Sequence, residues 1–217
     1  MIIIIGIIGV TSFLLGSIPF GYLLVRIFRG QDIRQTGSGN IGATNVARTG
    51  SKGLAIATLL LDALKGYLAV AHAFHAAARA PYHFEGSLPA AINWDTFAFQ
   101  LAAFAALCAI LGHMFTPWLR FKGGKGVATA VGAFAAMAPR AVLVSLALFI
   151  VVVAITRYVS LGSILGTAVF PVACWWLLPA MRNVIVMCLV AISSLLIILR
   201  HHANIGRLVA RNENRLW

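Results

Sequence analysis

The N-terminal stretch IIIIGIIGVTSFLLGSIPFGYLLV, residues 2–25, contains no charged side chain. About 20 apolar residues are enough for a helix to cross the hydrocarbon core of a bilayer. The stretch lacks the basic start and small-residue cleavage site of a signal peptide, so we interpret it as a retained membrane span. Only 10% of the whole chain is charged, against about 25% in soluble domains. The sequence therefore predicts an all-α polytopic membrane protein.

Hydropathy divides the chain into about seven candidate transmembrane helices that form one integral-membrane domain, residues 1–217. The fourth stretch is short, so a count of six is an alternative. Gly162 and Gly166 form a G-x-x-x-G pattern, which indicates close helix packing. The predicted spans are 2–28, 53–80, 96–116, 127–138, 140–156, 161–179 and 183–199.

Basic residues predict the orientation of these spans. With seven crossings, one side of the membrane receives only Arg79, Arg140 and Arg182 of the 17 Lys and Arg residues, and Lys65 lies inside the second span. The remaining bases collect on the opposite side, which the positive-inside rule assigns to the cytoplasm. The N-terminus is then outside and the C-terminus cytoplasmic. Topology and anionic-lipid contact alone would also explain this bias. The net charge of +12 is spread over membrane-bound loops, and without a recognised nucleic-acid-binding module we expect no nucleic acid partner.

The first polar loop on the basic side, residues 36–50, reads TGSGNIGATNVARTG. Gly37, Gly39 and Gly42 spell G-x-G-x-x-G, the pattern of a dinucleotide-binding turn. That turn requires a preceding buried strand within a βαβ unit. Here a membrane helix comes before it, so the sequence does not support a Rossmann fold.

The second polar loop, residues 112–129, reads GHMFTPWLRFKGGKGVAT. It fails the Walker A pattern twice, because Leu119 stands at the first glycine position and Gly126 follows Lys125. Glycines nevertheless let backbone N–H groups approach an anion, and Lys122 and Lys125 add positive charge. Helices beginning near Gly126 and Ala43 would add favourable dipoles. Two such loops on one face predict that two anionic groups are held together; flexible turns carrying topogenic charge are the alternative.

A third polar stretch, RYVSLGS at residues 157–163, and the tail RHHANIGRL at residues 200–208 lie on the same predicted side. His201 and Asn204 in this tail are candidate phosphate or hydroxyl contacts. The H-x-x-x-x-D signature of a large acyltransferase group follows none of the six histidines. An enzyme built on this sequence would therefore lack a carboxylate general base, and its substrate would be activated already or would bring its own base. Asp62 and Lys65, one helix turn apart in a span, are either functional or an ion pair that fixes helix packing.

These four motifs, in this order, resemble the PlsY family, the bacterial acyl-phosphate:glycerol-3-phosphate acyltransferases. The resemblance covers the whole chain and implies an enzyme of the bacterial inner membrane whose active site faces the cytoplasm. It implies transfer of a fatty acyl group from acyl phosphate to the 1-hydroxyl of sn-glycerol 3-phosphate. The products would be lysophosphatidic acid and inorganic phosphate, the first step of phospholipid synthesis. A substrate phosphate would assist proton removal, and no cofactor or metal is expected.

The resemblance also implies roles for individual residues and partners for the chain. Ser38, Lys122, Lys125 and His201 are expected to be catalytic. Arg48 is expected to bind the phosphate of glycerol 3-phosphate, and the lysines to hold the acyl-phosphate head group and stabilise the oxyanion. Expected partners are acyl phosphate, glycerol 3-phosphate, membrane lipids and the acyl-phosphate-forming enzyme. The remaining expected substrate-binding residues are Gly37, Gly39, Asn40, Asn45, Gly123, Gly124, Ser160, Asn204 and Arg207.

The tail departs from the family pattern H-R-E-N-I-K-R-L, because His202, Ala203 and Gly206 replace its Arg, Glu and Lys. The segment between the second and third spans, residues 81–95, has no predicted function. Two other function classes compete with the enzyme. A transporter or channel for a phosphorylated or anionic solute would need polar groups near the midplane and access from both sides. A non-catalytic scaffold that binds anionic lipid would depend on charge rather than on Ser38 or Asn204.

Overall fold

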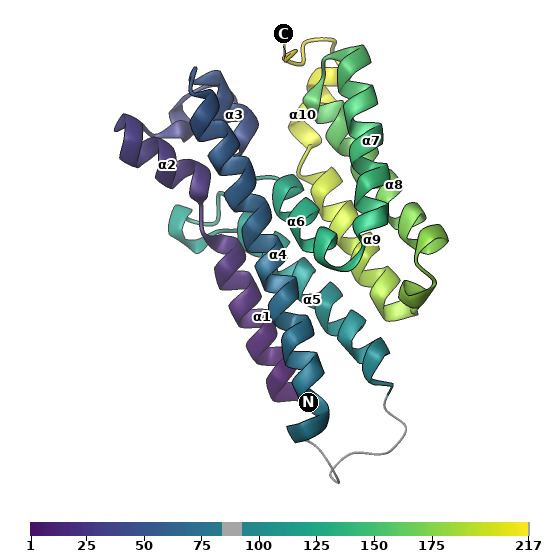
Figure 1. Ribbon diagram of the computed structural model, residues 1–217. Coiled ribbons are helices and arrows are strands. Elements are labelled where there is room, and N and C mark those ends of the chain that lie inside the picture. The colour runs from purple at the N-terminus through teal and green to yellow at the C-terminus, as the bar shows by residue number, and fades with distance from the viewer. Residues whose placement is uncertain (84–92, 217) are drawn as a thin grey trace. The chain divides into compact units, whose positions relative to one another are not determined.

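The computed structural model describes residues 1–83 and 93–216. Throughout these ranges the regular structure is helical, without a strand, which confirms the predicted all-α class. The helices form two compact units, Met1–Ala136 and Met137–Trp217, whose helices can be followed in Figure 1. Glu85 and most of the loop 81–95 lie outside the described residues.

The first unit is built on long apolar helices with short helices between them. Large apolar side chains such as Leu59, Leu60 and Ile56 are exposed on one of these helices. Exposed apolar surface of this extent suits contact with lipid rather than with water. The elements are α1 (Ile2–Ser17), α2 (Phe20–Arg29), η1 (Ile33–Gln35), α3 (Ala43–Arg48), α4 (Lys52–His83), α5 (Trp94–Met114), η2 (Pro117–Leu119) and α6 (Val127–Met137).

The second unit continues the same apolar character. The left-handed conformation of Arg157 (φ 64°) ends its first helix, and the next helix begins after Tyr158. A Cβ added at Gly162 would lie 2.8 Å from Cγ2 of Val153, and one at Gly166 would lie 2.9 Å from the Ser145 carbonyl oxygen. The G-x-x-x-G pattern therefore does serve close packing of two helices. The elements are α7 (Pro139–Thr156), α8 (Val159–Leu177), η3 (Pro179–Met181), α9 (Val184–Leu199) and α10 (His202–Val209).

Five segments among the described residues are long and apolar enough to cross a bilayer: Ile2–Arg29, Lys52–Pro81, Trp94–Leu119, Pro139–Thr156 and Val159–Leu177. They agree with five of the predicted spans. Val184–Leu199 is long enough to cross a bilayer only when it is taken together with His202–Val209, and the two helices are bent by 54° relative to each other. The predicted fourth span is the 11-residue helix α6, about 16 Å long at 1.5 Å per residue. The count of seven and the sidedness of the termini stay predictions.

Pro19 breaks the first predicted span into α1 and α2. Proline has no N–H, and Ile18 before it is extended (φ −60°, ψ 116°). Two carbonyls that this break releases accept hydrogen bonds from other helices or loops. The Ser17 oxygen accepts from Thr116 Oγ1 at 2.6 Å, and the Ile18 oxygen accepts from Lys65 Nζ at 2.7 Å. Side chains distant in sequence thus satisfy the backbone where the helix fails to.

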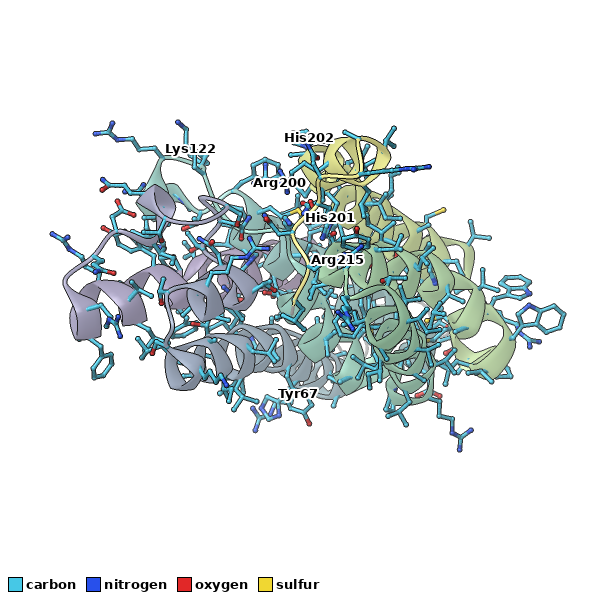
Figure 2. The ribbon with its side chains drawn as sticks, turned by 90° about the horizontal axis from the view of Figure 1, so that it is seen from above. Tyr67, Lys122, Arg200, His201, His202 and Arg215 are labelled. Atoms are coloured by element: carbon cyan, nitrogen blue, oxygen red, sulfur yellow. The ribbon has the colours of Figure 1, made fainter. Side chains whose placement is uncertain are left out.

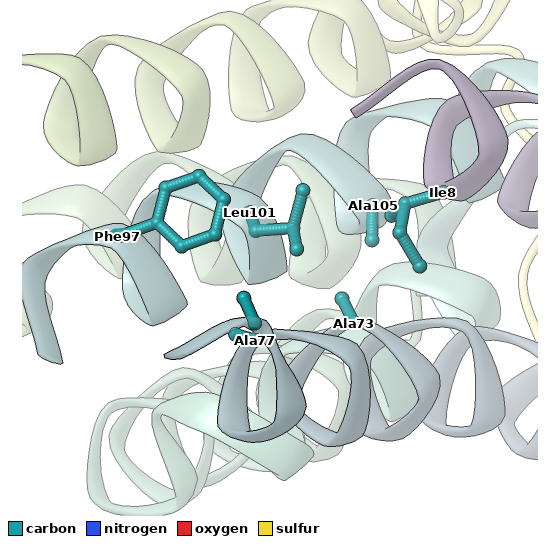
Figure 3. Close-up of a cluster of buried hydrophobic side chains, with 7 residues drawn as sticks. Ile8, Ala73, Ala77, Phe97, Leu101 and Ala105 are labelled. Carbon is teal, nitrogen blue, oxygen red and sulfur yellow. The ribbon is translucent and has the colours of Figure 1, made fainter. Parts of the chain in front are cut away.

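Small residues allow the helices of the first unit to approach closely. A Cβ at Gly66 would collide with the Thr129 carbonyl, and one at Gly132 with the Ala63 carbonyl, so α4 and α6 cross with their backbones nearly touching. Farther along, alanines of α4 interlock with larger side chains of α1 and α5 (Figure 3). The labelled members of this buried cluster are Ile8, Ala73, Ala77, Phe97, Leu101 and Ala105.

Candidate functional site

Asn45 organises the first polar loop. Its side-chain amide donates to the carbonyls of Ile33 (3.1 Å), Thr36 (3.0 Å) and Asn40 (2.8 Å), and its Oδ1 accepts from the Ser38 N–H at 2.8 Å. The residue is 2% exposed. The Asn45 side chain therefore supplies hydrogen bonds to backbone groups that regular secondary structure would otherwise pair. Asn45 was expected to contact substrate; in this structure its visible role is to shape the loop.

Glycine is required where the loop turns around this amide. Gly37 (φ +57°) and Gly39 (φ +68°) both adopt the left-handed conformation. A Cβ at Gly37 would also collide with Oδ1 of Asn45. The turn leaves Ser38 and Arg48 exposed at the surface of the loop. Asn40 turns the chain locally, because its Oδ1 accepts from the Gly42 N–H at 2.9 Å. As predicted, a helix begins at Ala43.

The second polar loop folds back on the end of α5. The N–H of Gly123 donates to the Met114 carbonyl at 3.1 Å, and that of Gly124 to the His113 carbonyl at 3.0 Å. These two amides were expected to form part of an anion-binding nest, and here they satisfy helix-terminal carbonyls instead. Glycine is needed for another reason: a Cβ at Gly123 would collide with the His113 carbonyl, and one at Gly124 with the His113 ring.

The lysines flank this glycine turn. Lys122 is exposed and extends outward from the ribbon (Figure 2), and Lys125 is partly buried just before α6 begins at Val127. Arg120 (φ 55°) and Phe121 (φ 61°) precede them in the left-handed conformation. Two successive non-glycine residues in this region store backbone strain, which is concentrated at functional sites in proteins.

The two loops share one buried cluster. Leu119 of the second loop packs with Ile41 and Val46 of the first, together with Val25, Ile33 and Ala55 of neighbouring helices. The two glycine-rich loops therefore lie next to each other within the first unit, while their common side of the membrane stays a prediction. Their exposed polar groups, including Ser38, Arg48 and Lys122, rest on a common apolar base.

In the second unit, three predicted site residues converge on a carboxylate. Glu213 Oε1 accepts from Ser160 Oγ at 2.8 Å and from Asn204 Nδ2 at 2.6 Å, and Oε2 accepts from Arg207 Nε at 2.6 Å. The side chain of Glu213 is 3% exposed. Burial raises the pKa of Glu213, but the hydrogen bonds from Asn204, Ser160 and Arg207 outweigh it and hold that pKa below its ordinary value.

No sequence motif described above includes Glu213, because a spacing of nine residues after Asn204 corresponds to no helical face. A pairing signal was nevertheless available: Glu213 is the only acid in a tail rich in arginine, and buried carboxylates are paired. The tail is also held by Leu216, whose N–H donates to the Arg157 carbonyl at 2.9 Å.

His201 lies where α9 bends into α10. It is 2% exposed, and its Nδ1 lies 2.8 Å from the Ile197 carbonyl. Since a carbonyl oxygen can only accept, Nδ1 carries the proton, and in the neutral ring Nε2 is the acceptor nitrogen. Figure 2 shows His201 with Arg200, His202 and Arg215 around the C-terminal segment. The three positions that depart from the family tail, His202, Ala203 and Gly206, are exposed.

Comparison with known proteins identifies the family to which this chain is similar. A family model described as Glycerol-3-phosphate acyltransferase matches residues 6–211. Glycerol-3-phosphate acyltransferases from Mesorhizobium japonicum and Trichlorobacter lovleyi are 42% and 43% identical, over 95% and 94% of this chain and 93% of each relative.

Solved structures agree with the sequence comparison. The crystal structure of PlsY, an integral membrane glycerol 3-phosphate acyltransferase, in its glycerol 3-phosphate form superposes with a TM-score of 0.80 and 33% identity. It covers 98% of this chain and 96% of that one. The lysophosphatidic acid form gives 0.78 and 32%, over 98% and 95%. The protein described here is thus an integral membrane protein of the PlsY family of glycerol-3-phosphate acyltransferases.

Proposed function

We propose that this chain transfers a fatty acyl group from acyl phosphate to the 1-hydroxyl of sn-glycerol 3-phosphate, and that the whole of residues 1–217 serves as one acyltransferase domain. The observation that carries the proposal is the likeness, over 98% of this chain, to PlsY in forms named for glycerol 3-phosphate and lysophosphatidic acid. These molecules stand on the two sides of this acylation, and glycerol 3-phosphate is the acceptor that we assign to this chain.

The reaction balances without a cofactor. The hydroxyl oxygen attacks the acyl carbonyl carbon, and a C–O ester bond forms. The bond between that carbon and the phosphate oxygen breaks, and its electron pair leaves with the phosphate. The hydroxyl proton passes to an oxygen of a substrate phosphate, so that inorganic phosphate and lysophosphatidic acid are released. Positioning and charge stabilisation are then the main work of the protein.

Acyl phosphate is favoured as donor by the state of Glu213. A carboxylate that accepts from three donors, and whose pKa is lowered, is a weak general base. A mixed anhydride already carries a good leaving group and needs little help from a base. Lys122 and Lys125, beside the first turn of α6, provide positive charge suited to a phosphate head group.

The remaining assignments follow the motif residues. In the first unit we assign the phosphate of glycerol 3-phosphate to Arg48, with Ser38 as a polar contact. In the second unit we assign Ser160, His201 and Asn204 as polar substrate contacts. Arg207 pairs with Glu213 at 2.6 Å. We assign this pair to the substrate-binding region of the second unit. Gly37, Gly39 and Asn40 shape the first loop beside the substrate, and in the second loop Gly123 and Gly124 place no side chain between the substrate and the turn. We place the enzyme in the bacterial inner membrane, with these loops on the cytoplasmic side and the acyl-phosphate-forming enzyme as a partner.

The test is a direct assay of purified protein in detergent or lipid cubic phase. Palmitoyl phosphate and glycerol 3-phosphate are supplied with a chelator, and inorganic phosphate and lysophosphatidic acid are measured together. We expect both products in equal amounts, and none from palmitoyl-CoA. Lys122→Ala and Lys125→Ala should each lower the rate by about 100-fold or more, as for loss of an oxyanion-stabilising donor. Lys52→Ala, which removes an exposed lysine at the start of α4, serves as the matched control and should retain activity.

Two results would contradict the proposal. Turnover of palmitoyl-CoA but not palmitoyl phosphate would overturn the assigned donor. Uptake of glycerol 3-phosphate into proteoliposomes without release of inorganic phosphate would favour the transporter instead.

A further inference from the structure

A buried charged cluster in the first unit has no part in the reaction as described above. Lys65 Nζ lies 2.8 Å from Asp62 Oδ1 and 3.0 Å from His113 Nδ1, and the same Asp62 oxygen lies 3.6 Å from that ring nitrogen. The side chains are between 1% and 5% exposed. Ionisable groups inside a membrane protein are costly and mark functional elements by default.

The ammonium of Lys65 determines which ring nitrogen of His113 holds the proton. A lysine ammonium has three N–H donors and no acceptor. Nζ donates to the Ile18 carbonyl at 2.7 Å and lies 3.0 Å from His113 Nδ1, while its 2.8 Å contact with Asp62 Oδ1 is an ion pair without hydrogen-bond geometry. The Phe20 ring, 5.7 Å away, adds a cation–π contact that also favours the charged form. His113 Nδ1 must then accept, so the neutral ring carries its proton on Nε2.

The Nε2 edge of this ring faces the second glycine-rich loop. A Cβ added at Gly124 would collide with His113 Nε2, so the Gly124 backbone lies directly against that atom. The His113 carbonyl accepts from the Gly124 N–H at 3.0 Å, so both the side chain and the backbone of this residue shape the turn. Lys122 and Lys125 stand immediately on either side of the glycine pair.

We propose that Asp62 and Lys65 fix His113 as the Nε2–H tautomer, and that His113 is a positioning residue whose Nε2–H edge supports the Gly123–Gly124 turn between the two lysines. The catalytic significance of the turn rests on the proposed function; the tautomer does not. In this arrangement the Asp62–Lys65 pair in the span positions the second loop indirectly, because it fixes the His113 ring on which the turn rests.

Two conservative variants separate the halves of the proposal. His113→Asn places an amide oxygen near the position of Nδ1, so it keeps an acceptor for Lys65 and loses the group at Nε2. His113→Gln reaches the Nε2 position with an N–H donor and loses the acceptor at Nδ1. We expect His113→Asn to melt within a few degrees of wild type, and to raise by about tenfold the KM of the substrate that the turn holds while leaving the other KM within twofold. We expect His113→Gln to melt lower and to keep both KM values within threefold.

Gly124→Ala, assayed beside them, identifies which substrate the turn holds, since the same KM should rise. If the Asn and Gln variants change KM and melting temperature in parallel, or if both raise the two KM values equally, the positioning role is wrong. A purely structural histidine would move the melting temperature without this split.

Imidazole ¹⁵N NMR on the full-length protein in detergent tests the tautomer without reference to activity. The resonance pair that disappears in His113→Asn should show a protonated Nε2 and an unprotonated Nδ1 at neutral pH. A protonated Nδ1, or an imidazolium, would overturn the assignment. If wild type fails to use acyl phosphate, the proposed function falls, while the NMR result still decides the state of His113.

Discussion

Asn204 and Glu213 meet through a 2.6 Å hydrogen bond from the amide Nδ2 to carboxylate Oε1. The same oxygen accepts from Ser160, and the other accepts from Arg207. A buried carboxylate thereby holds the start of α8, helix α10 and the C-terminal segment together. Two motifs far apart in the sequence depend on an acid that belongs to neither.

Replacing Glu213 should weaken this junction. Glu213→Gln puts an N–H₂ group where donors now converge, so at least one of Ser160, Asn204 and Arg207 loses its acceptor. We expect a loss of about 1–3 kcal/mol in unfolding free energy, as for an unsatisfied buried polar group, together with reduced activity. Thermal unfolding in detergent measures it. Asn214→Gln, at an exposed neighbouring position, should leave the melting temperature unchanged; an equal loss in both variants would show that the tail alone is sensitive.

The same carboxylate predicts a pH dependence. Because the pKa of Glu213 is lower in the folded protein than its ordinary value of 4.5, its contribution is fully present above pH 4.5. It is lost as pH falls through the folded pKa. The melting temperature of wild type minus that of Glu213→Gln should be constant from pH 7 to 5 and shrink at lower pH. A difference that grows on acidification would contradict the direction of the pKa shift.

Asp62 and Lys65 should show strong coupling. Lys65→Met leaves Asp62 buried without its cation, which costs about 3–5 kcal/mol when one member of a buried pair is removed. The double variant Asp62→Asn with Lys65→Met removes both charges and should recover part of that loss. Thermal unfolding of the single and double variants forms a double-mutant cycle. Strictly additive losses would mean that the 2.8 Å pair contributes no coupling.

The crossing of α4 and α6 should tolerate no Cβ. Gly66→Ala would drive a methyl group into the Thr129 carbonyl, and overpacking of this kind costs about 1–3 kcal/mol. Gly53 offers a matched control in the same helix, because a Cβ there meets nothing within 4 Å. Gly53→Ala should be neutral or slightly stabilising. The ratio of folded to aggregated protein after heating, measured by size-exclusion chromatography, compares the two.

Asn45 should be more sensitive to Asp than to Ala. In Asn45→Asp an oxygen replaces Nδ2 and faces the carbonyls of Ile33, Thr36 and Asn40, so attraction becomes repulsion. Asn45→Ala removes the hydrogen bonds without adding charge. We expect both to lower activity, with Asp the more severe. Limited proteolysis at the first loop provides the structural readout, and Thr44→Ala, an exposed neighbour, is the control; equal protection in all three would argue against the role of the amide.

The site was predicted unevenly from the sequence, and particular residues show why. The polar segments containing Ser38, Lys122 and Asn204 could be selected from the sequence because glycine, lysine and asparagine have local meaning in a turn or beside an anion. The amides of Gly123 and Gly124 were assigned to a ligand, whereas they bond the end of α5. The sequence cannot distinguish these uses, because both require the same freedom from side chains.

The sequence by itself determined the helices and the membrane character of this protein. In a bilayer every backbone group must be paired within its own segment, so an apolar run dictates a helix locally. Only the tertiary structure decided that Lys65 meets His113, 48 residues away, and that Ser160 meets Glu213, 53 residues away. A buried polar atom must find a partner wherever the fold supplies one, and that choice depends on three-dimensional proximity rather than on spacing along the chain.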